Sequence, residues 1–249
     1  METILVEGGI TATDTVSIDR SVVLKAASDE ATIKGCIEIK ANNVTVDGLK
    51  ITGAENSATT PTIKVSNQTG IKLTNNEITG NGNGIYVTKV SENGTVDITN
   101  NEITVGMTGI AIGSCENEAT VTITGNTLKG NDKHGLSLGK VENYELTITG
   151  NTFEGNKTSH YSGRNFVSEP EDEIPGEITQ FVDSNNIVGD WHLEWDTDGS
   201  GTYKNRVLLV SGQADAGENG NENNNGETTE LGDESNGNGD GNGNGGDGE

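Results

Sequence analysis

Apolar and polar residues alternate in short runs along the first 160 residues, and the runs recur at a nearly fixed distance. Each unit opens with alternating apolar positions, passes through a Gly/Asn turn and resumes with one more apolar position. Such alternation predicts β-strands, and the Asn and Gly residues predict turns between them. The unit starts lie 27, 25, 25 and 25 residues apart: VTVDGLKITG from Val44, IKLTNNEITG from Ile71, VDITNNEITV from Val96, VTITGNTLKG from Val121 and LTITGNTFEG from Leu146.

A second apolar run follows in the units, and no helical pattern separates the two runs. Two or three short strands per repeat predict a parallel β-helix, in which each coil buries its apolar face against the next at a strand spacing of about 4.8 Å. The second runs are TIKV from Thr62, GIYV from Gly84, GIAI from Gly109 and GLSL from Gly135. The alignment predicts three inward columns: Val44, Ile71, Val96, Val121 and Leu146; Val46, Leu73, Ile98, Ile123 and Ile148; Ile51, Ile78, Ile103, Leu128 and Phe153.

Asparagine recurs at one register of the repeat, at Asn76, Asn101, Asn126 and Asn151. Asparagine tolerates the left-handed conformation of a sharp turn, and its amide can bond to the same amide one coil away. We therefore predict an internal asparagine ladder with a scaffold role.

Less regular segments flank the repeats. Residues 1 to 43 open the same solenoid with short strand-like runs, and the pattern degrades after Thr152. We expect a degenerate capping region over about 166–212, with SEPEDEIPGE as a surface loop, a candidate last coil from Phe181 and a closing strand from Gly201. The prediction is one β-helix domain over residues 1–212, with about 6–7 coils.

The composition changes completely at Gln213. Residues 213–249 are rich in Gly, Asn, Asp and Glu, contain no Lys or Arg, and have Leu231 as their only large apolar residue. Such a segment buries too little surface to offset the entropy of ordering, so we predict a disordered linker or tail.

The charge balance excludes several kinds of partner. The formal net charge of −24 repels nucleic acid and anionic lipid. No apolar run is long enough to span a membrane, and no secretion signal is visible, so the chain is either cytoplasmic or an internal piece of a longer protein. Cys36 and Cys115 lie about three repeats apart and should be free thiols. We expect a monomer.

The opening TILVEGGITATDTVSIDRSVVLKA, the segment VTVDGLKITG and the ITxNxIxG units together resemble right-handed parallel β-helix proteins of the pectin-lyase-like superfamily. The resemblance covers roughly residues 3 to 165. It implies an all-β, right-handed solenoid and an extracellular or cell-surface location. It does not define an activity, because the superfamily includes polysaccharide lyases, glycoside hydrolases, epimerases, adhesins and passive surface proteins.

GIAIGS and HGLSLGK resemble stretches of polygalacturonases within that superfamily. Glycoside hydrolysis needs one carboxyl group to protonate the leaving oxygen and another to activate water or attack the sugar. This chain lacks those carboxylates, so we do not expect an active polygalacturonase. The resemblance places Asn83 and Tyr86 where two aspartates belong, Met107 and Thr108 at the paired acids, His134 at the histidine and Arg164 at a plausible distance for the arginine.

A local concentration of basic and aromatic residues is the main candidate binding site. His134 and His160 are 26 residues apart, so we expect them on adjacent coils, nearly above one another. Such a patch could hold an acidic sugar by charge-assisted hydrogen bonds, or consist only of solvated turn residues. A lyase or epimerase would use Arg164 to neutralise the carboxylate, His134 as base and Tyr161 as acid. The patch contains Lys133, His134, Lys157, His160, Tyr161 and Arg164.

The segment WDTDGSGTY places Asp196, Asp198 and Ser200 at alternating positions, as in the first half of an EF-hand loop. The twelfth position, which should supply a bidentate glutamate, is Val207. The segment is thus either a partial calcium site or a polar hairpin turn. Calcium is the one cofactor that the sequence leaves open.

These observations predict a non-catalytic cell-surface or extracellular β-helix module, adhesin-like or carbohydrate-binding, with polysaccharide or glycan as partner. One alternative is a polysaccharide lyase or epimerase acting on uronic-acid polymers. A second alternative is a structural spacer without a ligand.

Overall fold

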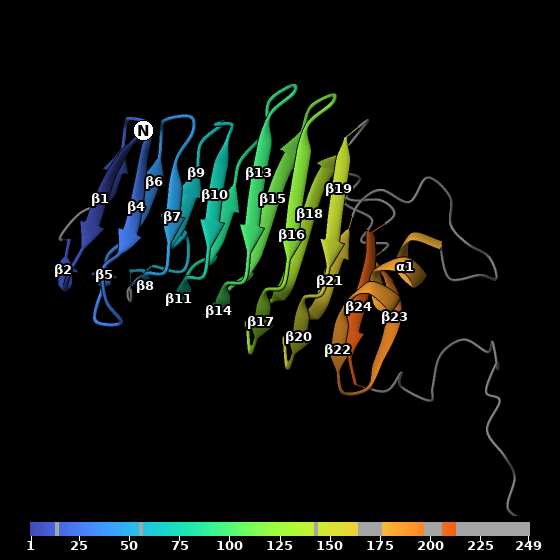
Figure 1. Ribbon diagram of the computed structural model, residues 1–249. Helices are drawn as coiled ribbons and strands as arrows, with labels where there is room; N and C mark the ends of the chain where they lie inside the picture. The colour runs from blue at the N-terminus through green and yellow to red at the C-terminus, as the bar shows by residue number, and fades with distance from the viewer. Residues whose placement is uncertain (13–14, 55–56, 142–143, 164–175, 197–205, 213–249) are drawn as a thin grey trace, which may run out of the picture. The chain divides into compact units, whose positions relative to one another are not determined.

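The protein is a stack of parallel β-strands in three sheets, as the computed structural model shows (Figure 1). The structure describes residues 1–12, 15–54, 57–141, 144–163, 176–196 and 206–212. Within these residues the chain passes from one sheet to the next and returns to the first one coil later, which gives a parallel β-solenoid of about 6 turns. The all-β repeat architecture predicted from the sequence is confirmed.

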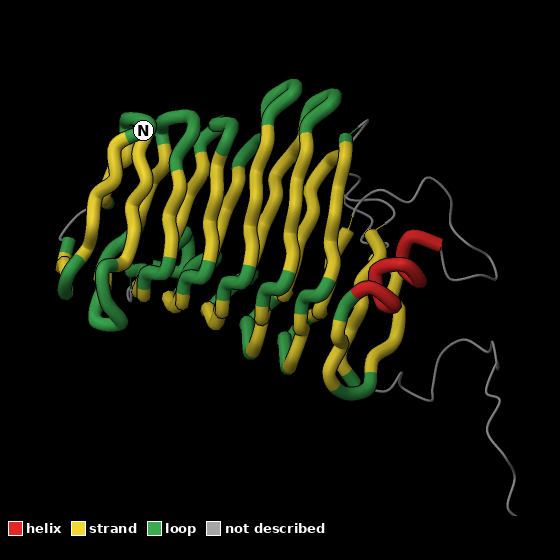
Figure 2. The backbone as a smooth tube through the Cα atoms, in the orientation of Figure 1, coloured by secondary structure: helices red, strands yellow, loops and turns green. Residues whose placement is uncertain are grey.

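The three sheets are named here A, B and C, and short turns connect their strands (Figure 2). Sheet A contains, in spatial order, β1 (Glu2–Val6), β4 (Val22–Ala26), β7 (Thr45–Asp47), β10 (Ile71–Thr74), β13 (Thr95–Thr99), β16 (Thr120–Thr124) and β19 (Glu145–Thr149). Sheet B contains β2 (Gly9–Thr11), β5 (Thr32–Lys34), β8 (Lys50–Thr52), β11 (Glu77–Gly80), β14 (Glu102–Val105), β17 (Thr127–Lys129), β20 (Thr152–Glu154) and β22 (Asn186–Val188). Sheet C contains β3 (Val16–Ile18), β6 (Ile37–Ile39), β9 (Ile63–Val65), β12 (Ile85–Val87), β15 (Ile110–Cys115), β18 (His134–Val141), β21 (Ser159–Gly163), β24 (Arg206–Ser211) and β23 (Trp191–Asp196).

The inward columns predicted from the repeat are confirmed by the strand register. In sheet A, Ile71 lies opposite Val96, Val96 opposite Val121 and Val121 opposite Leu146. The predicted sheet B column reaches Phe153, which is fully buried, and Ile187 of the cap lies opposite it. Each fully buried Val, Leu, Ile or Phe side chain contributes roughly 1.5–3 kcal/mol, so these columns hold the coils together.

The predicted asparagine ladder is also confirmed. The Asn76 side-chain amide donates to Asn101 Oδ1 at 3.0 Å, and equivalent bonds of 2.9 Å join Asn101 to Asn126 and Asn126 to Asn151. A further bond of 2.9 Å joins Asn151 to Asn185. The ladder therefore continues past the last regular repeat into the C-terminal cap.

The ladder asparagine was expected to adopt the left-handed conformation of the turn, but a different residue does so. It is the preceding residue: Asn75, Asn100, Gly125 and Gly150 have φ values of 56°, 55°, 66° and 66°. Asn and Gly are the residues that adopt this conformation at least cost. The turn thus uses one position for backbone geometry and the next for the buried amide.

The C-terminal end of the stack is closed by α1 (Gly176–Ser184), β22, β23 and β24. The Phe181 ring on α1 lies 5.3 Å from the Phe153 ring and 4.6 Å from the Tyr161 ring, measured between centroids. β22 pairs in parallel with β20, and β24 pairs antiparallel with β21, so the closing strand expected from Gly201 is confirmed for residues 206–211. The last coil expected from Phe181 is partly wrong, because residues 181–184 are helical and only residues 186–188 continue sheet B.

Residues Met1–Ala216 form one compact unit, which contains every described element. Cys36 and Cys115 are buried and free, as predicted. The tail predicted over residues 213–249 lies outside the described residues. No helix within the described ranges is both long and apolar enough to cross a membrane.

Candidate functional site

The basic patch predicted from the sequence is divided between surface and interior. Lys133 and Lys157 are exposed, and Lys157 forms an ion pair with Asp132 at 2.5 Å. His134 begins β18, is partly exposed and shares a hydrogen bond of 2.7 Å between its Nδ1 and the hydroxyl of Ser159. A ligand-binding role for the exposed members stays a prediction.

His134 and His160 lie on adjacent strands, as expected, but they are one residue out of register. His134 lies opposite Ser159, and His160 is one position further along β21. All five residues of β21 are buried, including Ser159, which lies opposite His134. The His160 and Tyr161 side chains, at 0% and 8% exposure, therefore do not join Lys133 on the surface.

His160 occupies the place that glycine holds in three preceding coils. A Cβ at Gly84 would lie 2.6 Å from the Gly109 carbonyl oxygen, one at Gly109 would lie 2.7 Å from that of Gly135, and one at Gly135 would lie 2.6 Å from that of His160. In the last coil the side chain fits, and His160 Nδ1 lies 3.3 Å from the Asn156 amide nitrogen. The His160 Nε2 atom is buried without a hydrogen-bond partner, and burial lowers the pKa of the ring. His160 is therefore a neutral interior residue.

The side chains of the remaining predicted site residues lie outside the described part of the structure. Arg164, Asp198 and Ser200 lie outside the described residues. Asp196 is the last residue of β23, where its backbone lies opposite Arg206, and its side chain is likewise outside the description. Among the described residues no three His, Cys, Asp or Glu side chains are placed to hold a metal ion. Calcium binding by this segment stays a prediction.

The outward column of sheet C supplies a different candidate site. It carries large or charged side chains at Glu38, Lys64 and Tyr86 and small ones before and after them, whereas the inward columns stay apolar throughout. By strand register the outward column reads Ser17, Glu38, Lys64, Tyr86, Ala111, Ser137 and Ser162.

A groove of about 430 Å³, open to solvent, lies over the early part of this column. Its floor includes Glu38, Lys64 and Tyr86, and the loop that precedes β9 lines it as well. We call this feature the sheet C groove. Its lining residues are Thr15, Cys36, Ile37, Glu38, Thr59, Thr60, Pro61, Lys64, Asn83 and Tyr86.

The loop that contributes to the lining is braced by its own hydroxyl groups and by the next coil. Ser57 Oγ lies 2.8 Å from Thr60 Oγ1 and accepts a hydrogen bond of 3.2 Å from the Thr60 backbone N–H. A side chain at Gly82, one coil later, would overlap the Thr60 carbonyl oxygen. Gly82 therefore permits the close approach that sets the position of this loop.

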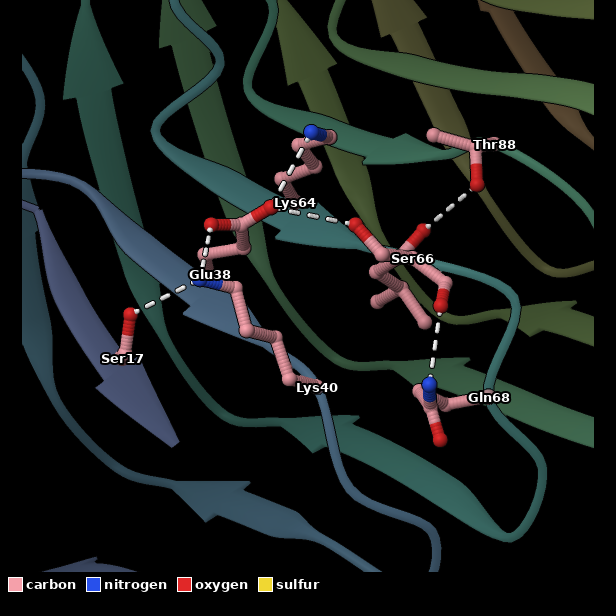
Figure 3. Close-up of polar contacts among 8 residues, drawn as sticks. Ser17, Glu38, Lys40, Lys64, Ser66, Gln68 and Thr88 are labelled. Carbon is pink, nitrogen blue, oxygen red and sulfur yellow. Dashed lines mark hydrogen bonds and ion pairs between the residues drawn. The ribbon is translucent and has the colours of Figure 1, made fainter. Parts of the chain in front are cut away.

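The charged part of the groove centres on Glu38. Figure 3 shows the Glu38 carboxylate between Lys40 and Lys64, whose ammonium groups lie 2.9 Å and 3.0 Å from its two oxygens. The Ser66 hydroxyl donates to the same carboxylate at 3.2 Å. Hydrogen bonds from Lys40 and then Lys64 lower the pKa of Glu38 to about 2. The carboxylate therefore stays ionised at neutral and mildly acidic pH.

Asn83 and Tyr86 provide the neutral polar groups of the groove. The Asn83 side-chain oxygen accepts a hydrogen bond of 3.2 Å from the Thr108 backbone N–H, which fixes the amide and leaves its NH₂ group to donate elsewhere. Tyr86 is partly exposed, and no described residue hydrogen-bonds to its hydroxyl. A phenol ring with an apolar face and a free hydroxyl suits a ligand that is itself amphipathic.

Sequence reasoning considered Asn83 and Tyr86 only as replacements for missing aspartates and did not consider Glu38 or Lys64. One signal was present: the first spacing between units is 27 residues, whereas the later spacings are 25. The longer unit contains the loop at Ser57–Pro61, which lines the groove. An insertion in an otherwise regular repeat thus marked the site.

A solenoid with apolar columns inside, an asparagine ladder and a polar groove on one outer face defines a β-helix repeat protein. The family model described as "Right handed beta helix region" matches residues 10–153, more than half of the chain. The chain belongs to this family. Neither the curated proteins nor the solved structures give a significant match.

Proposed function

We propose that this β-helix is a non-catalytic, adhesin-like carbohydrate-binding module and that the sheet C groove holds the sugar. The observation that carries the proposal is the partly exposed Tyr86 ring beside the Asn83 amide in an open groove. Sugars present apolar C–H faces and many hydroxyl groups, so a ring and fixed amide donors together match their chemistry.

The chemistry of the groove favours binding over hydrolysis. Glycoside hydrolysis requires two carboxyl groups, and Glu38 is the carboxylate among the described lining residues. A general acid needs a pKa near the working pH, whereas the pKa of Glu38 is about 2. Glu38 therefore does not supply a proton to a leaving oxygen.

The lyase or epimerase alternative has less support. It would need a base and an acid around one uronic-acid unit. His134 is at the surface, but Tyr161 packs against Phe181 in the cap, so these two side chains do not converge on one ligand. We expect polygalacturonate and alginate to give no unsaturated product absorbing in the ultraviolet when incubated with the purified chain.

The proposed location is extracellular or cell-surface. It rests on the resemblance of the repeats to pectin-lyase-like proteins, many of which contact polysaccharides outside the cell. The groove chemistry is compatible with this location but does not depend on it.

A glycan array probed with the full chain, with and without calcium, tests the proposal. Tyr86→Ala should weaken binding to the best ligands about 3- to 10-fold, the range that one aromatic contact accounts for. Thr122→Ala changes an outward residue of sheet A, away from the groove, and should leave affinity unchanged. Absence of binding to every glycan, or equal effects of the two substitutions, would refute a sugar site in the groove.

A further inference from the structure

We infer that the sheet C groove selects uncharged sugar chains and discriminates against polyuronates. This inference rests on the proposed function, because it specifies which sugars the groove takes. It differs from the acidic-sugar patch predicted around Lys133, which lies elsewhere on the solenoid.

The positive charges beside the groove are already paired. Lys64 gives a hydrogen bond to Glu38, and Lys40 bonds both to Glu38 and to the Ser17 hydroxyl at 3.3 Å. A ligand carboxylate that approached Lys64 would also approach the ionised Glu38 carboxylate. Like-charge repulsion then offsets part of the attraction to the lysine.

The field of the whole chain acts in the same direction. A polyuronate carries one negative charge on each sugar unit, whereas the lining contains a single cation, Lys64, among its described residues. The formal net charge of the chain is −24, and a field of that sign lowers the local concentration of polyanions. An uncharged chain does not experience this repulsion.

The uncharged groups of the groove match a neutral sugar. Tyr86 presents a ring and a hydroxyl, Asn83 presents an NH₂ group, and Thr59 adds an exposed hydroxyl at the rim. Lys64 uses one of its three N–H donors on Glu38 at 3.0 Å, so further donors can reach sugar hydroxyls without removing a partner from the carboxylate. Recognition of a neutral ligand therefore leaves the Glu38 network intact.

The test compares chains of equal length on the intact protein by calorimetric titration. Cellohexaose, mannohexaose and xylohexaose serve as neutral probes, and hexagalacturonate serves as the charged probe, each at low and at physiological ionic strength. We expect at least one neutral probe to bind at least tenfold more tightly than hexagalacturonate, with little dependence on salt. The difference in affinity between the neutral probe and hexagalacturonate should decrease as salt screens the repulsion.

Substitutions inside and outside the groove test whether the probes bind there. Lys64→Gln removes the charge but keeps a donor, so binding of the neutral probe should change less than about threefold. Lys72→Gln is the matched control, because Lys72 is an outward lysine of sheet A that faces Asp97 at 3.8 Å, away from the groove. Tyr86→Ala should weaken neutral binding about 3- to 10-fold.

The outcomes separate the two proposals. Tighter binding of hexagalacturonate that weakens with salt and is lost in Lys64→Gln but not in Lys72→Gln overturns the selectivity inference while the sugar-binding function stands. No binding of any probe overturns both. Neutral binding that Tyr86→Ala leaves unchanged places the sugar outside the groove, and that result also overturns both.

Discussion

The asparagine ladder gives the sharpest stability prediction, at Asn126. Its side-chain oxygen accepts hydrogen bonds of 2.9 Å from both the backbone N–H and the side-chain amide of Asn101. Its own amide donates to the Ile98 carbonyl at 2.8 Å, to the Thr124 carbonyl at 3.2 Å and to Asn151 Oδ1 at 2.9 Å. Asn126 is fully buried, so water cannot replace these partners.

Asn126→Ala should destabilise the fold by about 3–5 kcal/mol. The buried Asn101 N–H loses its side-chain acceptor, and such an unsatisfied group costs about 1–3 kcal/mol. The other lost hydrogen bonds contribute about 0.5–1.5 kcal/mol each, and relaxation of the neighbouring amides reduces their sum. The amide also leaves a small cavity between coils.

Urea unfolding followed by far-ultraviolet circular dichroism measures the difference in the free energy of unfolding. Asn117→Ala is the matched control, since Asn117 is an exposed asparagine in the turn before β16 and should change stability by less than about 0.5 kcal/mol. Equal stabilities of the two variants would show that the ladder bonds do not hold the coils together. Hydrogen exchange should further show lost protection at the Asn101 amide in Asn126→Ala alone.

Two further predictions concern the groove and the cap. Gly82→Ala should weaken glycan binding and destabilise the fold by about 1–2 kcal/mol, because the new methyl group overlaps the Thr60 carbonyl. Gly8→Ala is the control, since a Cβ at Gly8 has open space around it. Unchanged glycan affinity in Gly82→Ala would contradict the role of the loop before β9. Burial lowers the pKa of His160 in the folded chain, so the unfolded chain binds the proton more readily and stability should fall as the pH drops below the ordinary value of 6.5. Melting temperatures at about pH 7.5 and about pH 5 should therefore differ less in His160→Gln than in the parent, and an equal difference would show that His160 is not a buried neutral residue.

The regular part of the fold could be predicted because its repeat has a constant register. A spacing of 25 residues places Val96 on Ile71 and Val121 on Val96, so one alignment defined the columns in every regular coil. Helix α1 was missed, although the apolar positions Ile178, Phe181 and Val182 follow helical spacing. The repeat pattern had created an expectation of strands. A cap has to differ from the coils because it covers the last regular coil, where Phe181 of α1 packs against Phe153.

The candidate site could not be predicted in the same way. The error at His160 was one residue in register: the offset between paired residues is 26 from Ile110 to Leu136, but 25 from His134 to Ser159. Burial of His160 was not decided by this register, because all five residues of β21 are buried. Tyr161 packs against Phe181 of the cap, and the repeat contains no information about the cap. The groove also depends on how the loop before β9 packs against Gly82, and strand periodicity contains no information about that contact.

Inward and outward positions of each coil are under different constraints, and this difference explains why the repeat predicts the fold well and the function poorly. Inward positions must match the coil above and below, and this requirement keeps the columns apolar from Val46 to Ile123. Outward side chains face solvent and need not fill a closed core, so the same outward position of sheet C can carry Lys64 in one coil and Ala111 two coils later without disturbing the stack. A binding site is therefore expected where outward residues depart from the repeat and a loop departs from its length, and these two departures coincide at the sheet C groove.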